Sequence, residues 1–190
     1  MAIKHHCALL ELDRVQVMLQ AAKERVLLQL QTHNVPLQHC VQLICRIQGI
    51  SLKNLSEGCG YHRNHLYQTL SGIRSPSKVF RDGVSKRLSV DPWAYCASSE
   101  AVFDGSSNSI KRILIFLQRE NIPLQHSVSM ICKTKGIRLG KLAISFGIHR
   151  NYLFQTLSGD RTPSADLRNR MRKELGVDPW NYAPRREVCA

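Results

Sequence analysis

Apolar residues recur at helical spacing along most of the chain. Ile110, Ile113, Leu114 and Leu117 show the i, i+3, i+4, i+7 spacing of one buried helix face. No segment alternates between apolar and polar residues with the two-residue period of a half-buried strand. The pattern therefore predicts an all-α protein, with an opening helix near residues 22–33 and a second one like it near 110–121.

The same pattern occurs twice. A shift of 87 residues aligns 36–95 with 123–182 without a gap, and 32 of these 60 positions are identical. Each copy is large enough to hold a small core of its own. We therefore expect one domain at 22–96 and a second at 110–183, with about five helices in each. A short linker at 97–109, rich in Ser, Gly, Asp and Asn, joins them, and a short tail at 184–190 follows.

The first 21 residues are expected to form an additional N-terminal helix. Leu9, Leu12, Val15 and Leu19 lie close to the spacing of one helix face. Two interpretations of this segment remain open. It is a dimerisation helix that makes the protein a homodimer, or it packs on the first copy.

Helix boundaries can be placed from capping residues. Ser51 is suited to cap the short helix that follows it, whereas Arg138, at the equivalent position of the second copy, is a poor cap. A further helix is expected after residues 62–71 and another after 149–158. Ser75-Pro76 and Thr162-Pro163 are expected to begin these helices, each as a cap followed by proline at the first helical position.

Two short helices around a glycine turn, the second rich in polar side chains, are typical of a helix-turn-helix motif. Gly60 and Gly147 are expected to supply the positive φ of this turn, and the second helices to run over 62–71 and 149–158. In that motif the second helix lies in the DNA major groove, where Arg pairs with guanine and Asn or Gln with adenine. The residues expected to read base edges are Arg63, Asn64 and Gln68 in the first copy and Arg150, Asn151 and Gln155 in the second.

The charge balance favours a polyanionic partner. The chain has 27 Lys and Arg against 14 Asp and Glu, a net charge of +13 and a pI of about 9.8. Nucleic acid is the first candidate for such a partner and an anionic membrane surface the second. We expect no membrane anchor and no signal peptide. The seven cysteines form no Cys-x-x-Cys, so a reducing cytoplasm, with association to a bacterial nucleoid, is the expected location.

Both copies resemble the Cro and lambda-repressor-like (XRE-type) helix-turn-helix family. In the first copy the resemblance lies in the run from Leu55 to Gly72, then Arg74-Ser75-Pro76 and Leu88-Ser89-Val90. The second copy is the closer match, with Leu142-Ala143, Gly147, the run 159–164 and Leu175-Gly176-Val177. The Val-Asp-Pro-Trp that ends each copy is similar to the small Ner-like phage regulators.

This resemblance implies two tandem lambda-repressor-like domains in a transcription regulator of a bacterium, phage or mobile element. It implies double-stranded DNA as the partner, with paired half-sites read by the two recognition helices. It also implies phosphate contacts at the start of the first helix of the motif and around the second helix. The residues concerned are Ser51, Lys53, His62, Arg74, Arg138, Lys141, His149 and Arg161.

Other functions remain open at this point. An architectural DNA binder with little sequence preference, or a protein–protein adaptor that reuses the fold, fits the same helices. An enzyme is not expected, because no nucleophile–base pair, paired carboxylates or phosphate-binding glycine loop is present. No metal, cofactor or small-molecule substrate is expected either. The half-sites are inverted if the domains pack with pseudo-two-fold symmetry, and direct repeats fit a flexible linker.

Overall fold

The computed structural model describes residues 2–95 and 103–184, and its account of side chains begins at Val17. Within these ranges every regular element is helical and no strand occurs, which confirms the all-α prediction. The first repeat contains α1 (Ala2–Thr32), α2 (Leu37–Ile47), α3 (Leu52–Gly58), α4 (Arg63–Leu70), α5 (Lys78–Leu88) and the 3₁₀ helix η1 (Pro92–Tyr95). The second contains α6 (Ser107–Arg119), α7 (Leu124–Thr134), α8 (Leu139–Ser145), α9 (Arg150–Ser158), α10 (Ala165–Leu175) and η2 (Pro179–Tyr182). Apart from α1, which is longer than α6, equivalent elements match to within one residue.

Each repeat buries the apolar face of its helices around its second helix. In α2, Ile44 and Cys45 are almost completely buried, and their equivalents Ile131 and Cys132 are buried in α7. Leu66 of α4 and Leu153 of α9 are buried to the same degree. Burial of these residues on one face of each helix leaves the polar faces of α4 and α9 outside.

Two boundaries differ from those expected. The helices α5 and α10 are capped by Ser77 and Ser164, whose hydroxyls accept hydrogen bonds from Phe80 N and Leu167 N at 3.3 and 3.2 Å. The prediction that Ser75-Pro76 and Thr162-Pro163 begin these helices was wrong. A serine directly before the first helical turn satisfies a free N–H group there, and the proline then lies one residue outside the cap.

The second boundary concerns the expected linker. Helix α6 begins at Ser107, inside the segment 97–109, because Ser106 caps it by accepting from Ser109 N at 3.3 Å. The Asp104 carboxylate accepts from Ser106 Oγ at 2.7 Å and from Ser109 Oγ at 3.0 Å. These hydrogen bonds lower the pKa of Asp104 and order the chain just before the helix.

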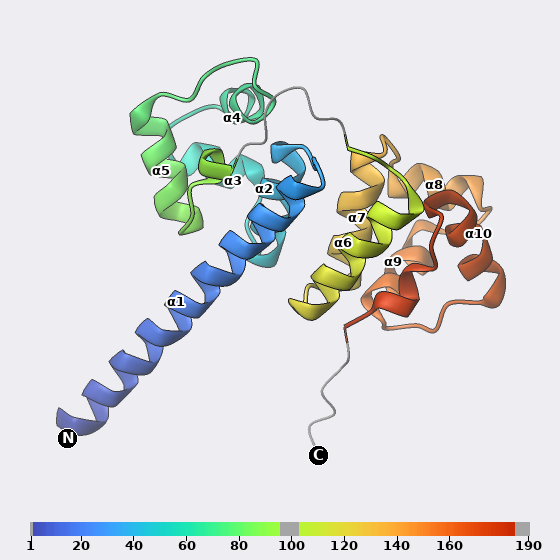
Figure 1. Cartoon of the computed structure of the whole chain (residues 1–190), viewed down its shortest axis with the longest axis horizontal. Coiled ribbons are helices and arrows are strands. Elements are labelled where there is room, and N and C mark those ends of the chain that lie inside the picture. The colour runs from blue at the N-terminus through green and yellow to red at the C-terminus, as the bar shows by residue number, and fades with distance from the viewer. Residues whose placement is uncertain (1, 96–102, 185–190) are drawn as a thin grey trace.

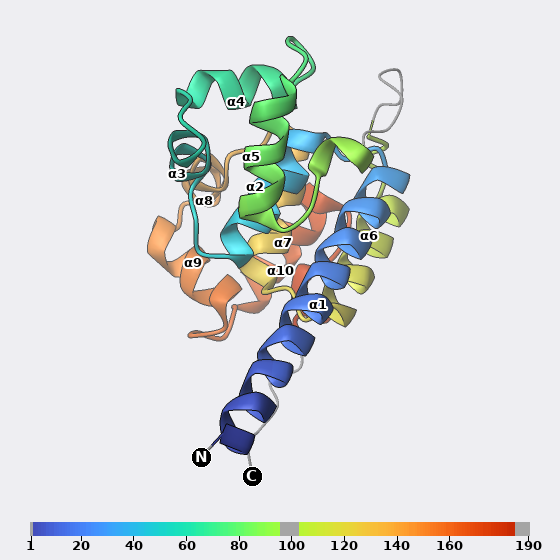
Figure 2. The ribbon, with the colours of Figure 1, turned by 90° about the vertical axis from the view of Figure 1, so that its left-hand side faces the viewer.

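The repeats pack against each other along α2 and α7, and along α1 and α6 (Figures 1 and 2). Arg46 Nη1 donates to Ser129 Oγ at 2.6 Å, and Lys133 Nζ donates to Gln42 Oε1 at 2.7 Å. Arg46 is equivalent to Lys133 and Gln42 to Ser129, so each contact is the counterpart of the other. Such reciprocal contacts imply an approximate two-fold relationship between the repeats.

The pairing of α1 with α6 is reciprocal in the same way. The Arg25 guanidinium makes a bidentate contact with the Glu120 carboxylate, with N–O distances of 3.2 and 3.0 Å. The equivalent positions are Arg112 and His33, and burial lowers the pKa of His33, with the charge of Arg112 as a second cause. In both pairs an arginine of one helix therefore faces the residue near the C-terminal end of the other helix. The two helices run antiparallel.

Helix α1 extends at its N-terminal end well beyond the helices it packs on (Figure 1). Val17, Met18 and Leu19 are all exposed. The side chains of Leu9, Leu12 and Val15, on which the proposed dimerisation helix partly depends, lie outside the part of the chain whose side chains are described.

Candidate nucleic-acid interface

The helix pair α3 and α4, and its counterpart α8 and α9, lie along one side of the molecule, opposite α1 and α6 (Figure 2). Gly60 and Gly147 join the pairs with φ of +78° and +66°, a left-handed conformation that favours glycine. In the first repeat Ser56 Oγ also donates to the carbonyl oxygens of Tyr61 and His62 at 3.0 Å. The turn therefore fixes where α4 begins relative to α3.

Histidine caps the N-terminus of both polar helices. The Nδ1 atom of His62 accepts from Asn64 N at 3.3 Å, and Nδ1 of His149 accepts from Asn151 N at 3.2 Å. An imidazole that accepts at Nδ1 carries its proton on Nε2, which is then a hydrogen-bond donor. Both histidines are exposed, so the same side chain can cap the helix and offer a donor to a phosphate.

The side chains expected to read bases are presented outward. Arg63, Asn64 and Gln68 are all exposed, while Leu66 and Leu70 on the other face of α4 are buried. Helix α9 repeats this division. Its exposed residues are Arg150, Asn151 and Gln155, and its buried ones are Leu153 and Leu157.

The side chains expected to contact phosphates are also exposed, and several are held by neighbours. Ser51 Oγ caps α3 by accepting from Asn54 N at 3.0 Å, whereas Arg138 makes no side-chain cap on α8. Lys53 pairs with Glu57 at 3.7 Å on the surface. The Arg161 guanidinium lies over the Tyr152 ring, 4.8 Å from its centre. The remaining members of this group are Arg74 and Lys141.

The structure gathers only part of this set at one place. A groove of about 790 Å³ lies between the repeats, and seven pairs of equivalent positions line it. The expected site residues that line it are Ser51, Lys53, Arg63, Arg138 and Arg150. The other expected site residues do not line the groove. They are Asn64, Gln68, Asn151, Gln155, Arg74, Lys141, Arg161, His62 and His149.

Sequence reasoning did not identify the half-buried cations of this groove. Arg46 and Lys133, on the central helices α2 and α7, are half-buried lining residues whose hydrogen-bond partners across the boundary are the neutral Ser129 and Gln42. No Asp or Glu is among the residues of the described chain that line the groove. The sequence shows only that this position is a cation in both copies. That alone does not distinguish a position on the open surface from one in a groove.

Burial and like charge both act on this cluster. Desolvation lowers the pKa of Lys133, and the charge of Arg46 lowers it further. Burial lowers the pKa of His126, with Arg46 as a second cause, and the pKa of His39, with Lys133 as a second cause. The groove therefore concentrates positive charge, with no carboxylate among its described lining residues, and a cleft of one sign attracts counter-ions of the other.

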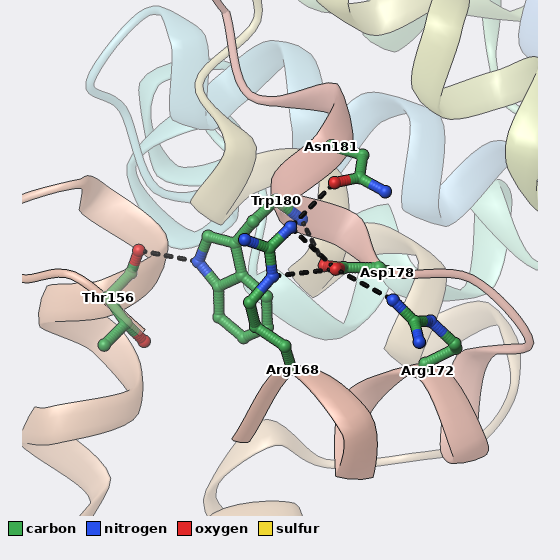
Figure 3. Close-up of polar contacts among 6 residues, drawn as sticks. All are labelled: Thr156, Arg168, Arg172, Asp178, Trp180 and Asn181. Carbon is green, nitrogen blue, oxygen red and sulfur yellow. Dashed lines mark hydrogen bonds and ion pairs between the residues drawn. The ribbon is translucent and has the colours of Figure 1, made fainter. Parts of the chain in front are cut away.

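Helices α4 and α9 are also held at their C-terminal ends. Trp180 Nε1 donates to the carbonyl of Thr156, near the end of α9, at 2.9 Å (Figure 3). The nearly buried Asp178 accepts from Trp180 N at 3.1 Å and from Arg168 Nε at 2.8 Å. The first repeat makes the same set of contacts through Trp93, Asp91 and Arg81. The Val-Asp-Pro-Trp segment therefore positions the polar helix, and each Trp packs against the core.

Among the residues that the structure describes, no group of His, Cys, Asp and Glu is arranged to hold a metal ion. No helix in the described ranges has both the length and the apolar character needed to cross a membrane.

Comparison of the chain with protein-family models, with curated proteins and with solved structures found no match.

Proposed function

We propose that the protein is a sequence-specific double-stranded DNA-binding transcription regulator built from two lambda-repressor-like helix-turn-helix domains. In this proposal α3 and α4 form the motif of the first domain, and α8 and α9 that of the second. The recognition helices are α4 and α9. The observation that carries the proposal is the outward display of Arg, Asn and Gln at equivalent positions of two helices in one molecule.

The residue types support base reading rather than simple solvation. Arg can donate two hydrogen bonds to guanine O6 and N7, and Asn and Gln can pair with adenine N6 and N7. Gln68 lies one turn after Asn64, and Gln155 one turn after Asn151, so each pair shares a helix face. Phosphate contacts by Arg74, Arg161 and Lys141 would hold the duplex against these faces.

The packing of the repeats supports inverted rather than direct half-sites. Two domains related by an approximate two-fold axis present their recognition helices in opposite senses, as the two subunits of a repressor dimer do. Half-site centres are then expected about 10 bp, or a multiple of this, apart. The recognition helices differ where His65 of α4 is matched by Tyr152 of α9, so the half-sites are expected to be similar without being identical.

The test compares two pairs of substitutions on a duplex selected by the unaltered protein. Arg63→Ala with Arg150→Ala should reduce preference for that duplex over random DNA about tenfold per half-site, because each lost bidentate contact costs about 1–3 kcal/mol. Lys53→Ala with Lys141→Ala should weaken binding to all duplexes alike and reduce the salt slope by roughly 2.

Lys111→Ala with Arg119→Ala removes the same charge from exposed positions of α6 and serves as the matched control. If site preference survives in the Arg63 and Arg150 variant, the assignment of the recognition helices is wrong. If the unaltered protein shows no preference and its binding depends only on salt, the protein is an architectural binder.

A further inference from the structure

The cations of the groove between the repeats are arranged at two depths. Arg46 and Lys133 are half-buried and belong to the two central helices, whereas Lys53, Arg63, Arg138 and Arg150 are exposed. We propose that this groove binds one small, multiply charged phosphate compound per chain, with Arg46 and Lys133 as its innermost contacts.

The inner pair supports a ligand because its charge is not balanced by the protein. Both side chains donate to neutral oxygens, those of Ser129 and Gln42, and neither makes a salt bridge within the described chain. Two partly desolvated like charges beside each other are unfavourable, and a multivalent anion between them removes that cost. Arg and Lys each have further N–H groups available for phosphate oxygens.

The size of the groove favours a small ligand over a duplex at these two residues. Its volume of about 790 Å³ lies within the range of roughly 300–1,000 Å³ that is usual for small-molecule pockets. A DNA duplex is rigid, so its phosphates meet the exposed cations first. Arg46 and Lys133, set deeper between α2 and α7, are accessible to a compound that enters the groove.

The walls of the groove allow two sources for the phosphate group. Tyr67 and Phe154 are equivalent, half-buried lining residues, and an aromatic ring can stack on a nucleobase. The Arg150 guanidinium already lies over the Phe154 ring, 5.1 Å from its centre. A nucleoside polyphosphate would use both the cations and the rings, whereas an inorganic polyphosphate would use the cations alone.

Arg63 and Arg150 belong both to the groove and to the surface proposed to read DNA. A ligand bound between them would therefore compete with the duplex, and its concentration would regulate DNA binding. This consequence rests on the proposed function, whereas the binding site itself does not.

The experiment is isothermal titration of the full chain, freed of nucleic acid, with adenosine triphosphate, inorganic triphosphate and adenosine at about 0.15 M salt. Saturable binding of one triphosphate per chain, with none for adenosine, is expected. Tighter binding of adenosine triphosphate than of inorganic triphosphate identifies a nucleotide as the source, and equal binding identifies polyphosphate. Absence of binding by both triphosphates overturns the proposal.

Substitutions locate the site. Arg46→Gln and Lys133→Gln retain a donor for Ser129 and Gln42, and each should weaken triphosphate binding at least tenfold. Lys111→Gln and Arg119→Gln each remove the same charge from outside the groove, and each should change affinity less than threefold. Equal weakening in both sets would show a non-specific charge effect and overturn the proposal. Circular dichroism verifies folding, and DNA binding measured in the same variants separates failure of this site from failure of the proposed function.

Discussion

Arg46 and Lys133 occupy equivalent positions of the two repeats, and their hydrogen bonds across the boundary match. Arg46 donates to Ser129, and Lys133 donates to Gln42, the residue equivalent to Ser129. This reciprocity extends to α1 and α6, where Arg25 meets Glu120 and Arg112 lies near His33. The two copies therefore pack face to face through matching surfaces. A single chain with this arrangement has the symmetry that a homodimer of one repeat would have.

The interface should weaken in mild acid. Burial lowers the pKa of His33, His39 and His126 below the ordinary 6.5, and each faces a cation of the other repeat. The unfolded chain then binds more protons than the folded one once the pH falls below about 6.5, so the free energy of unfolding decreases as the pH falls further. Urea unfolding at pH 7.5 and 5.5 should show the lower midpoint at pH 5.5.

A double variant, His39→Gln with His126→Gln, should reduce this pH dependence. Glutamine at 39 still offers a partner to Thr134 Oγ1, which lies 3.1 Å from the imidazole. Some dependence of stability on pH should remain because of His33 and His65. Burial lowers the pKa of both, and the charge of Arg74 also lowers that of His65. An unchanged slope in the double variant would show that the acid sensitivity does not arise between α2 and α7.

The two equivalent aspartates should differ in what they contribute to stability. The Asp178 side chain is 2% exposed and that of Asp91 30% exposed, although both bind the equivalent Arg and Trp N. Asp178→Ala should cost about 2 kcal/mol, because it removes the nearly buried acceptor of Trp180 N and Arg168 Nε. Asp91→Ala should cost about 1 kcal/mol, since water can replace the lost carboxylate. Denaturant titration measures both, and equal losses would contradict the account.

The capping role of histidine can be separated from contact with phosphate. His149→Ala removes the acceptor for Asn151 N and should lower stability by about 1 kcal/mol. His149→Asn retains a capping oxygen and should leave stability within a few tenths of a kcal/mol. Thermal unfolding monitors the cap, and DNA affinity monitors the donor at Nε2. If Asn also loses stability in full, His149 does not act through its cap.

Cys45 and Cys132 should be inert in the folded protein. Burial raises the pKa of each thiol to about 12, from an ordinary value of 9.0. Because only the thiolate reacts with an alkylating reagent, neither should be modified at pH 8 unless the chain unfolds. The folded state keeps these thiols protonated, so its stability falls as the pH rises above about 9. Peptide mapping after brief alkylation, with and without urea, checks this; rapid native labelling of either residue would contradict it.

Local signals in the sequence predicted most of each helix but little of the packing between copies. Periodicity placed the core residues Ile110 and Ile113, and Gly60 was assigned the positive φ that it has. Ser77 was missed because Ser75-Pro76 offers an equally plausible cap two residues earlier. Capping bonds reach only three residues, so such ambiguity can be resolved only by the rest of the fold.

Contacts between helices far apart in the chain could not be predicted from any local pattern in the sequence. Arg87 Nη2 on α5 donates to Gly58 O at the end of α3 at 2.6 Å, in a place where a side chain at 58 would collide with the guanidinium. In the second repeat Arg170 on α10 instead donates to Phe146 O at 2.6 Å. Different residues thus satisfy the end of the same helix. The groove cations Arg46 and Lys133 were missed for the same reason, since their role depends on the other repeat.

The central claim is that two related recognition helices read an inverted repeat of DNA. Its most direct test is selection of bound sequences from a randomised duplex pool at about 0.15 M salt. The account predicts enrichment of two similar half-sites in inverted orientation, with centres about 10 bp or a multiple apart. Enrichment of direct repeats, of a single half-site, or of no sequence at all would contradict it.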